Sequence, residues 1–227
     1  MAEEKKRYSR GVIVEFDFTA VDGAQLLFDT AKKVLKGHGV ALTLKQECKY
    51  LAGGNYQGAL KELFEATGSD AAPVAVAQEL GDAFKAALTA KAVAAVTPEF
   101  LGFVKELTER NIKVVVATRS DVEQLRALFA DLNRDLVTVY AEPSNTYGNC
   151  KWDAWRRACN QNGLVDVLTA AVAGSGKGVK SALVAGLAAL AVVHDHVRYQ
   201  DFGGADDVVE AFDPAMADTV CRMLHLR

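Results

Sequence analysis

The sequence predicts an α/β protein: a doubly wound parallel sheet of Rossmann type with an inserted all-α domain. Short apolar runs rich in β-branched residues alternate with helical segments from residue 97 onward. This alternation is typical of a parallel sheet covered by helices on both faces. Between the first two apolar runs, residues 23–95 have helical spacing, which is far more chain than a crossover connection needs. We therefore expect a separate helical domain there.

The elements follow from apolar patterning and from helix start and stop signals. Thr97-Pro98 and Asp213-Pro214 each combine an N-cap residue with a first-turn proline, and Ser120 is expected to cap the helix after it. The predicted strands are 11–16, 114–117, 136–140, 169–173, 187–193 and 206–209. The predicted helices are 24–37, 43–68 with a break at Gly53-Gly54, 73–95, 98–110, 121–132, 151–162, 176–186 and 214–226.

These elements divide the chain into three predicted parts. Residues 11–22 and 96–227 would form the α/β core domain, residues 23–95 the helical cap, and residues 1–10 a charged tail. The 227 residues are 50% hydrophobic with a formal net charge of −3. Such a composition excludes an intrinsically disordered chain and disfavours a basic, electrostatic nucleic-acid binder.

Cysteine spacing and hydropathy predict a cytoplasmic protein without a membrane segment. Cys48, Cys150, Cys159 and Cys221 are widely separated and form no CxxC motif, as expected of reduced thiols. The longest apolar run, 182–193, is too short for a bilayer and is interrupted by glycine. No apolar segment that could act as a signal peptide follows the charged first ten residues.

Candidate functional residues follow the predicted strands. In an open parallel sheet, ligands bind beyond the carboxyl ends of the strands, so these residues should share one edge. In chain order they are Glu15 and Asp17, Thr118 and Arg119, Lys151, Gly174-Ser-Gly-Lys177, and His194-Asp195-His196.

This order resembles the haloacid dehalogenase superfamily of phosphohydrolases, in particular its phosphatase and phosphomutase branch. Glu15-Phe-Asp17-Phe-Thr19 is similar to the family's Asp-x-Asp-x-Thr motif, and Thr118 and Lys151 fall on its Ser/Thr and Lys positions. Residues 171–182 match the fourth motif in spacing, and the helical insertion lies where this branch has its cap. The resemblance implies Mg²⁺, a phosphorylated substrate, and an acid/base position at Asp17.

Two departures from the family pattern argue against catalysis. Glu15 stands at the position of the nucleophilic Asp, and its extra methylene displaces the carboxylate from in-line alignment with phosphorus. Ala173 and Gly174 stand where the family carries its metal-binding acids, so one side of the Mg²⁺ shell is missing. The sequence therefore predicts a protein that keeps the fold but has lost hydrolysis or retains very little.

The remaining residues predict binding of an anion. We expect Thr118, Arg119 and Lys151 to contact a small phosphorylated or anionic ligand, although a protein partner is an open alternative. Glu15 and Asp17 would form a weak or absent metal site, to which Asp195 would contribute the missing acid. Asn55 and Tyr56 lie in the most loop-like part of the cap and are expected to face the substrate.

The runner-up interpretation is an active Mg²⁺-dependent phosphohydrolase or phosphomutase that acts on a small phosphorylated metabolite through Glu15. Two other motifs are weaker. Residues 174–178 depart from the phosphate-binding loop pattern GxxxxGK[ST], so nucleotide binding there is disfavoured. His194 and His196 could share a face and bind a metal, but a role on a surface loop is favoured.

Overall fold

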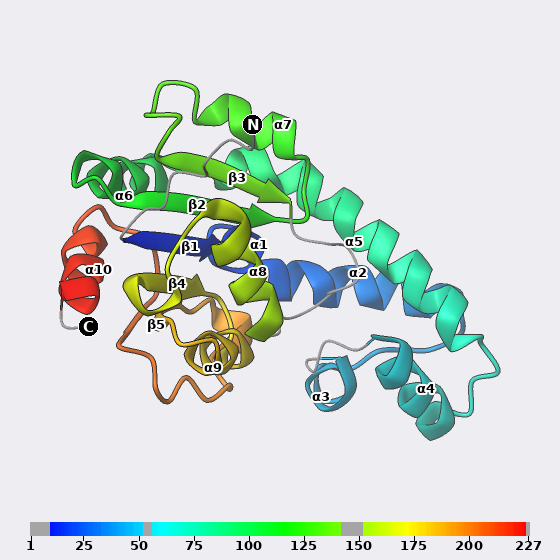
Figure 1. Ribbon diagram of the computed structural model, residues 1–227. Coiled ribbons are helices and arrows are strands. Elements are labelled where there is room, and N and C mark those ends of the chain that lie inside the picture. Colours follow the sequence, from blue (N-terminus) through cyan, green and yellow to red (C-terminus); the bar gives the residue numbers. More distant parts are fainter. Residues whose placement is uncertain (1–9, 52–55, 142–151, 226–227) are drawn as a thin grey trace, which may run out of the picture.

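A computed structural model describes residues 10–51, 56–141 and 152–225. In these residues, six strands form one parallel sheet with the order β3-β2-β1-β4-β5-β6 (Figure 1). Each neighbouring pair is parallel. The strands are β1 (Gly11–Glu15), β2 (Lys113–Thr118), β3 (Val137–Ala141), β4 (Thr169–Ala173), β5 (Ala188–Val192) and β6 (Asp207–Val209).

Helices connect the strands and make up the insertion. The α-helices are α1 (Phe16–Thr19), α2 (Gly23–Gly37), α3 (Leu44–Gln46), α4 (Tyr56–Thr67), α5 (Pro73–Ala95), α6 (Pro98–Glu109), α7 (Val122–Leu128), α8 (Trp152–Asn162), α9 (Gly176–Val184) and α10 (Met216–His225). The short helical turns are the π-helical η1 (Glu47–Leu51) and the 3₁₀-helical η2 (Asp166–Leu168) and η3 (Asp195–Val197).

The sheet is buried on both faces, as the doubly wound prediction requires. Val12 and Val14 of β1 belong to an apolar core that includes residues of α6 and α10. Ile13, between them, belongs to a second core that includes residues of α8 and α9. This division follows from the strand geometry, because successive side chains point to opposite faces. The predicted fold class is confirmed.

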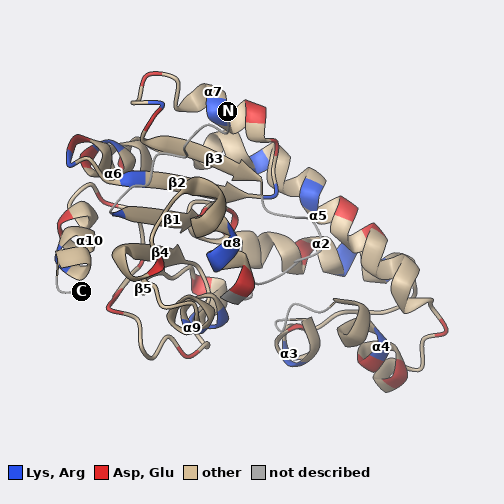
Figure 2. Ribbon diagram, viewed as in Figure 1, with Lys and Arg blue, Asp and Glu red and all other residues tan. Residues whose placement is uncertain are grey.

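The chain between β1 and β2 forms the helical insertion. The two long helices α2 and α5 pack against each other, and α4 packs against α5 (Figure 1). Leu80, Phe84 and Leu88 of α5 are fully buried and belong to the same apolar core as Val12 and Val14. Figure 2 shows acidic and basic residues intermixed along α5 instead of a continuous basic face.

Three local predictions are corrected by the structure. Asp121, and not Ser120, caps α7, because its carboxylate accepts a hydrogen bond from the Gln124 amide at 3.0 Å. The last helix begins at Met216, since the Asp213 carboxylate instead forms a turn by accepting from the Ala215 amide at 2.7 Å. Phe16 begins α1 and does not continue the first strand.

Within the described part of the chain, no single helix is long and apolar enough to cross a bilayer. The α5 and α6 pair, which bends by 76° at the connection, reaches that length and hydropathy only as a pair.

Two matched leucine substitutions test whether the insertion belongs to the core. Leu80→Ala should lower the free energy of unfolding by about 2–5 kcal/mol, because Leu80 is fully buried and its truncation leaves a cavity. Leu44→Ala is the control, and should change it by no more than about 0.5 kcal/mol because Leu44 is 51% exposed. Urea denaturation measures both values. Equal losses for the two variants would contradict this packing.

Candidate functional site

Part of the predicted site lies together at the carboxyl-terminal edge of the sheet. Glu15 ends β1, Asp17 lies in the short helix α1 that follows, and Thr118 ends β2. Gly174 follows β4, the other neighbour of β1. The parallel order thus brings together residues far apart in the sequence, as the sequence analysis expected.

Asp17 is buried and held by the segment that follows β2. Its Oδ1 accepts a hydrogen bond from the Thr118 hydroxyl at 2.6 Å, and its Oδ2 accepts from the Arg119 main-chain amide at 2.8 Å. The Thr118 oxygen in turn accepts from the Ser120 amide at 2.9 Å. A hydroxyl has one hydrogen to donate, so Thr118 donates to Asp17 and has none left for a second acceptor in this arrangement.

Arg119 places a buried cation beside Asp17. Its side chain is only 2% exposed, and its Nη1 lies 3.9 Å from Asp17 Oδ2. The guanidinium carbon lies 5.7 Å from the centre of the Phe18 ring, within the range of a cation–π contact. The charge of Asp17 is therefore compensated from within the protein.

Glu15 reaches across to the neighbouring strand end. Its side chain is buried, and Oε2 accepts a hydrogen bond from the Gly174 amide at 3.1 Å. A Cβ atom added to Gly178 would lie 3.1 Å from the same oxygen. The carboxylate consequently lies beside the amino end of α9, where main-chain N–H groups favour negative charge.

Gly174 leaves no room for a side chain. A Cβ atom at this position would lie 1.8 Å from the Phe18 carbonyl oxygen, far inside contact distance. An acidic residue could enter position 174 only after the backbone of α1 or of the β4–α9 connection had moved. At position 174 an acidic side chain is thus excluded by the course of the main chain, whereas at Ala173 it is only absent from the sequence.

The described residues do not fit a Mg²⁺ site. They contain no group of three or more His, Cys, Asp or Glu side chains placed to hold a metal ion. Both oxygens of Asp17 accept protein hydrogen bonds, and a guanidinium lies beside them. A Mg²⁺ ion bound through Asp17 would have to share these oxygens with two protein donors and lie beside the guanidinium. The part of the chain that the structure describes thus offers no shell for the cation that the family resemblance implied.

The residues that follow β5 lie in different surroundings. The Asp195 side chain is 90% exposed and pairs with Arg198 at 2.6 Å, so the structure does not bring it to Glu15 and Asp17. His194 Nε2 lies 2.9 Å from the Thr19 carbonyl oxygen. The His196 side chain is buried, and its Nε2 lies 3.5 Å from Glu47 Oε2 in η1. Burial raises the pKa of the Glu47 carboxyl, and the nearby His196 opposes this rise without cancelling it.

Three further predicted positions carry less information. Lys151 and Asn55 lie outside the described residues. Tyr56 begins α4, and its side chain is buried in the apolar core that extends through the insertion. Its predicted contact with a substrate stays a prediction.

Sequence reasoning missed the contacts between the site and the insertion. The Phe18 ring lies 6.2 Å from the Phe84 ring of α5, and the Ser120 hydroxyl lies 3.4 Å from that of Thr89 in the same helix. A further contact that was missed lies outside the insertion, where the Gln200 side chain accepts a hydrogen bond from the Gly176 amide at 2.9 Å. These residues carry no local motif, because each contributes only through a partner that is distant in the sequence.

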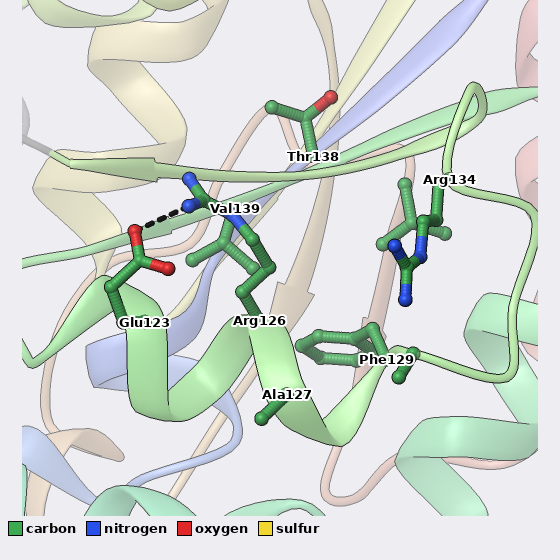
Figure 3. A pocket seen from close by; sticks show the side chains of 9 residues that line it. Glu123, Arg126, Ala127, Phe129, Arg134, Thr138 and Val139 are labelled. Carbon is green, nitrogen blue, oxygen red and sulfur yellow. Dashed lines mark hydrogen bonds and ion pairs between the residues drawn. The ribbon is translucent and has the colours of Figure 1, made fainter.

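A separate cavity of about 400 Å³ lies between α7 and β3 (Figure 3). Phe129 and Val139 line it together with Arg126 and Arg134, and Arg126 pairs with Glu123. It is lined by neither Glu15 nor Asp17. The size of this cavity is therefore no guide to the candidate site.

Comparison with solved structures identifies the fold. A β-phosphoglucomutase from Clostridium difficile matches with a TM-score of 0.71 at 13% identity, over 96% of this chain and 98% of that one. A HAD hydrolase of family IA, variant 3, from Entamoeba histolytica matches with a TM-score of 0.64 at 16% identity, over 95% and 99%. The chain has the haloacid dehalogenase fold.

A third match with this fold is CbbY from Rhodobacter sphaeroides, solved in complex with phosphate. It has a TM-score of 0.64 and 18% identity, over 90% of this chain and 95% of that one. No protein-family model matches the sequence, and no curated protein matches it. At these identities the matches establish the haloacid dehalogenase fold, as the motif order predicted, and leave the chemistry to be argued from the residues.

A pair of glycine substitutions tests the close approach at Gly174. Gly174→Ala should lower the free energy of unfolding by about 3 kcal/mol or more, because the added carbon overlaps the Phe18 carbonyl. Gly37→Ala, at the end of α2 with nothing within 4 Å of the added carbon, should be neutral or stabilising by about 0.5–1 kcal/mol. Denaturant titration measures both, and a neutral Gly174→Ala would contradict the geometry.

Proposed function

We propose that this chain is a haloacid dehalogenase-type phosphohydrolase-like protein in which phosphoryl transfer is lost or very weak, and which binds a small phosphorylated or other anionic ligand. One observation carries the proposal. The Glu15 carboxylate bonds to the Gly174 amide at the place where the backbone admits no acidic side chain. The position of the nucleophile and the position of the missing metal ligand are thus joined by a hydrogen bond within the protein.

The orientation of Glu15 disfavours nucleophilic attack. An attacking carboxylate must point at phosphorus from about 3–3.5 Å in line with the leaving group. Glu15 is buried with Oε2 directed to a main-chain amide. Attack through Oε2 would require the loss of that hydrogen bond, which raises the barrier before any chemistry begins.

The surroundings of Asp17 disfavour acid/base catalysis. A general acid or base must lie within hydrogen-bond reach of the proton that it transfers. Asp17 already accepts from the Thr118 hydroxyl and from the Arg119 amide, and Arg119 provides a positive charge nearby. These contacts stabilise the ionised carboxylate, so they disfavour the protonated form that a general acid needs.

Positive charge near the sheet edge supports binding of an anion. The proposed ligand contacts are Arg119 and Lys151, with Asn55 and Tyr56 on the side of the cap. Thr118 could donate to the ligand only by giving up its hydrogen bond to Asp17. In this proposal residues 23–95 are the cap and residues 11–22 with 96–227 the core. The structure of CbbY from Rhodobacter sphaeroides with phosphate makes inorganic phosphate a suitable first probe.

Hydrolysis of an aryl phosphate with Mg²⁺ tests the loss of catalysis. We expect the wild type and Glu15→Ala to release product at the same rate as a protein-free control, because neither aligns a nucleophile. Asp17→Asn should give the same result. Robust turnover by the wild type that both substitutions abolish would contradict the proposal, and would establish the active Mg²⁺-dependent phosphohydrolase or phosphomutase instead.

Thermal unfolding with inorganic phosphate tests the anion site. Phosphate at about ten times its dissociation constant should raise Tm by about 3 °C, since a ligand that binds only the folded state stabilises it. Lys151→Met should reduce this rise at a given phosphate concentration. Lys105→Met, which removes an exposed lysine of α6, is the matched control and should keep it. Equal responses to phosphate and chloride, or equal responses of the two variants, would contradict the site.

A further inference from the structure

We propose that Arg119 is the resident cation of this site, and that its guanidinium takes the electrostatic place of the divalent metal ion for which the described residues offer no ligand set. This inference rests on the proposed loss of the metal site. It concerns metal binding and stability and not turnover, so it can fail separately from the proposed loss of catalysis.

The first argument is the burial of two carboxylates that are close in the sequence. Glu15 and Asp17 are separated by one residue, and their exposed fractions are 2% and 1%. Buried carboxylates lose favourable hydration. A fold that keeps both ionised must supply donors and positive charge. In haloacid dehalogenase-type enzymes the resemblance assigns that role to Mg²⁺, whereas here Arg119 lies beside Asp17.

The second argument is that Arg119 is built into the site. Its main-chain amide and its guanidinium both face Asp17 Oδ2, at 2.8 Å and 3.9 Å. The Phe18 ring lies under the guanidinium and follows Asp17 directly in the chain. With a side chain 2% exposed, this arginine lies inside the protein and not on its surface. A guanidinium stays protonated at any physiological pH, so the positive charge is permanent.

The third argument is mutual exclusion between Arg119 and a metal ion. A divalent cation bound to Asp17 would lie close to the guanidinium and would be strongly repelled in this buried setting. It would also lack the acid that position 174 cannot accommodate. The buried arginine and the lack of space at Gly174 therefore act in the same direction. The first puts a positive charge beside the place where the metal ion would lie, and the second excludes one of its acidic ligands.

Removal of the charge should create a response to metal that the wild type lacks. We expect the Tm of the wild type to be unchanged by about 10 mM MgCl₂, and isothermal titration with MnCl₂ to give no binding heat. Arg119→Met should lower Tm, and Mg²⁺ should then raise it by about 3 °C through the uncompensated charge of Asp17. Arg119→Met with Asp17→Asn should lose that rise, because the carboxylate is gone.

Two control variants sharpen the result. Arg126→Met removes an arginine of α7 that is 55% exposed, and it should respond to Mg²⁺ as the wild type does. Lys151→Met tests the other cation that the family resemblance places here. If Lys151→Met creates the Mg²⁺ response and Arg119→Met does not, the resident cation is Lys151 and the inference is overturned.

A wild-type Tm that Mg²⁺ raises and that Asp17→Asn makes insensitive would also overturn it. If Arg119→Met does not fold, the comparison is made in the Asp17→Asn background. In that background the Arg119→Met variant should fold and its Tm should fall only slightly, because the carboxylate beside Arg119 is gone. Failure to fold in both backgrounds would show that Arg119 acts through packing, and would overturn the inference.

Discussion

The close approach of Gly174 to the Phe18 carbonyl is the constraint on which the candidate site depends. Because a Cβ would lie 1.8 Å from that oxygen, the connection from β4 to α9 packs directly against α1. This approach places the Gly174 amide within reach of Glu15, whose longer side chain spans from β1 to β4. Main chain thus occupies the space that an acidic side chain at position 174 would need. The Glu15 carboxylate is directed to the Gly174 amide at the same place.

The balance of charge follows from the same packing. Glu15 is hydrogen-bonded to Gly174, so Asp17 is stabilised by three consecutive residues at the end of β2. Thr118 donates its hydroxyl, and Arg119 contributes its main-chain amide and its guanidinium. The Ser120 amide donates to the Thr118 hydroxyl and orients it. The segment also touches α5 of the insertion through Ser120 and Thr89. A movement of the insertion would therefore shift the segment that holds Asp17, although α5 and Asp17 lie far apart in the sequence.

Fold and chemistry depend on different residues in this chain. The sheet order, the two apolar cores and the insertion after β1 depend on many apolar positions, which tolerate exchange among similar residues. A TM-score of 0.71 at 13% identity with the β-phosphoglucomutase from Clostridium difficile fits that tolerance. The chemistry depends on a few positions such as Glu15 and Gly174, where one methylene or one missing side chain alters what the site can do.

Sequence alone determined the fold class, the insertion and the sheet edge that carries Glu15, Asp17 and Thr118. The segments 73–95 and 169–173 were predicted with the observed bounds, because apolar spacing and a first-turn proline act locally. Only the tertiary structure decided that Thr118 donates to Asp17, that the Arg119 guanidinium turns inward, that Asp195 faces solvent and that Gly174 has no space. Local patterns govern backbone hydrogen bonding and burial, whereas a side chain's direction is set by neighbours that arrive from distant parts of the chain.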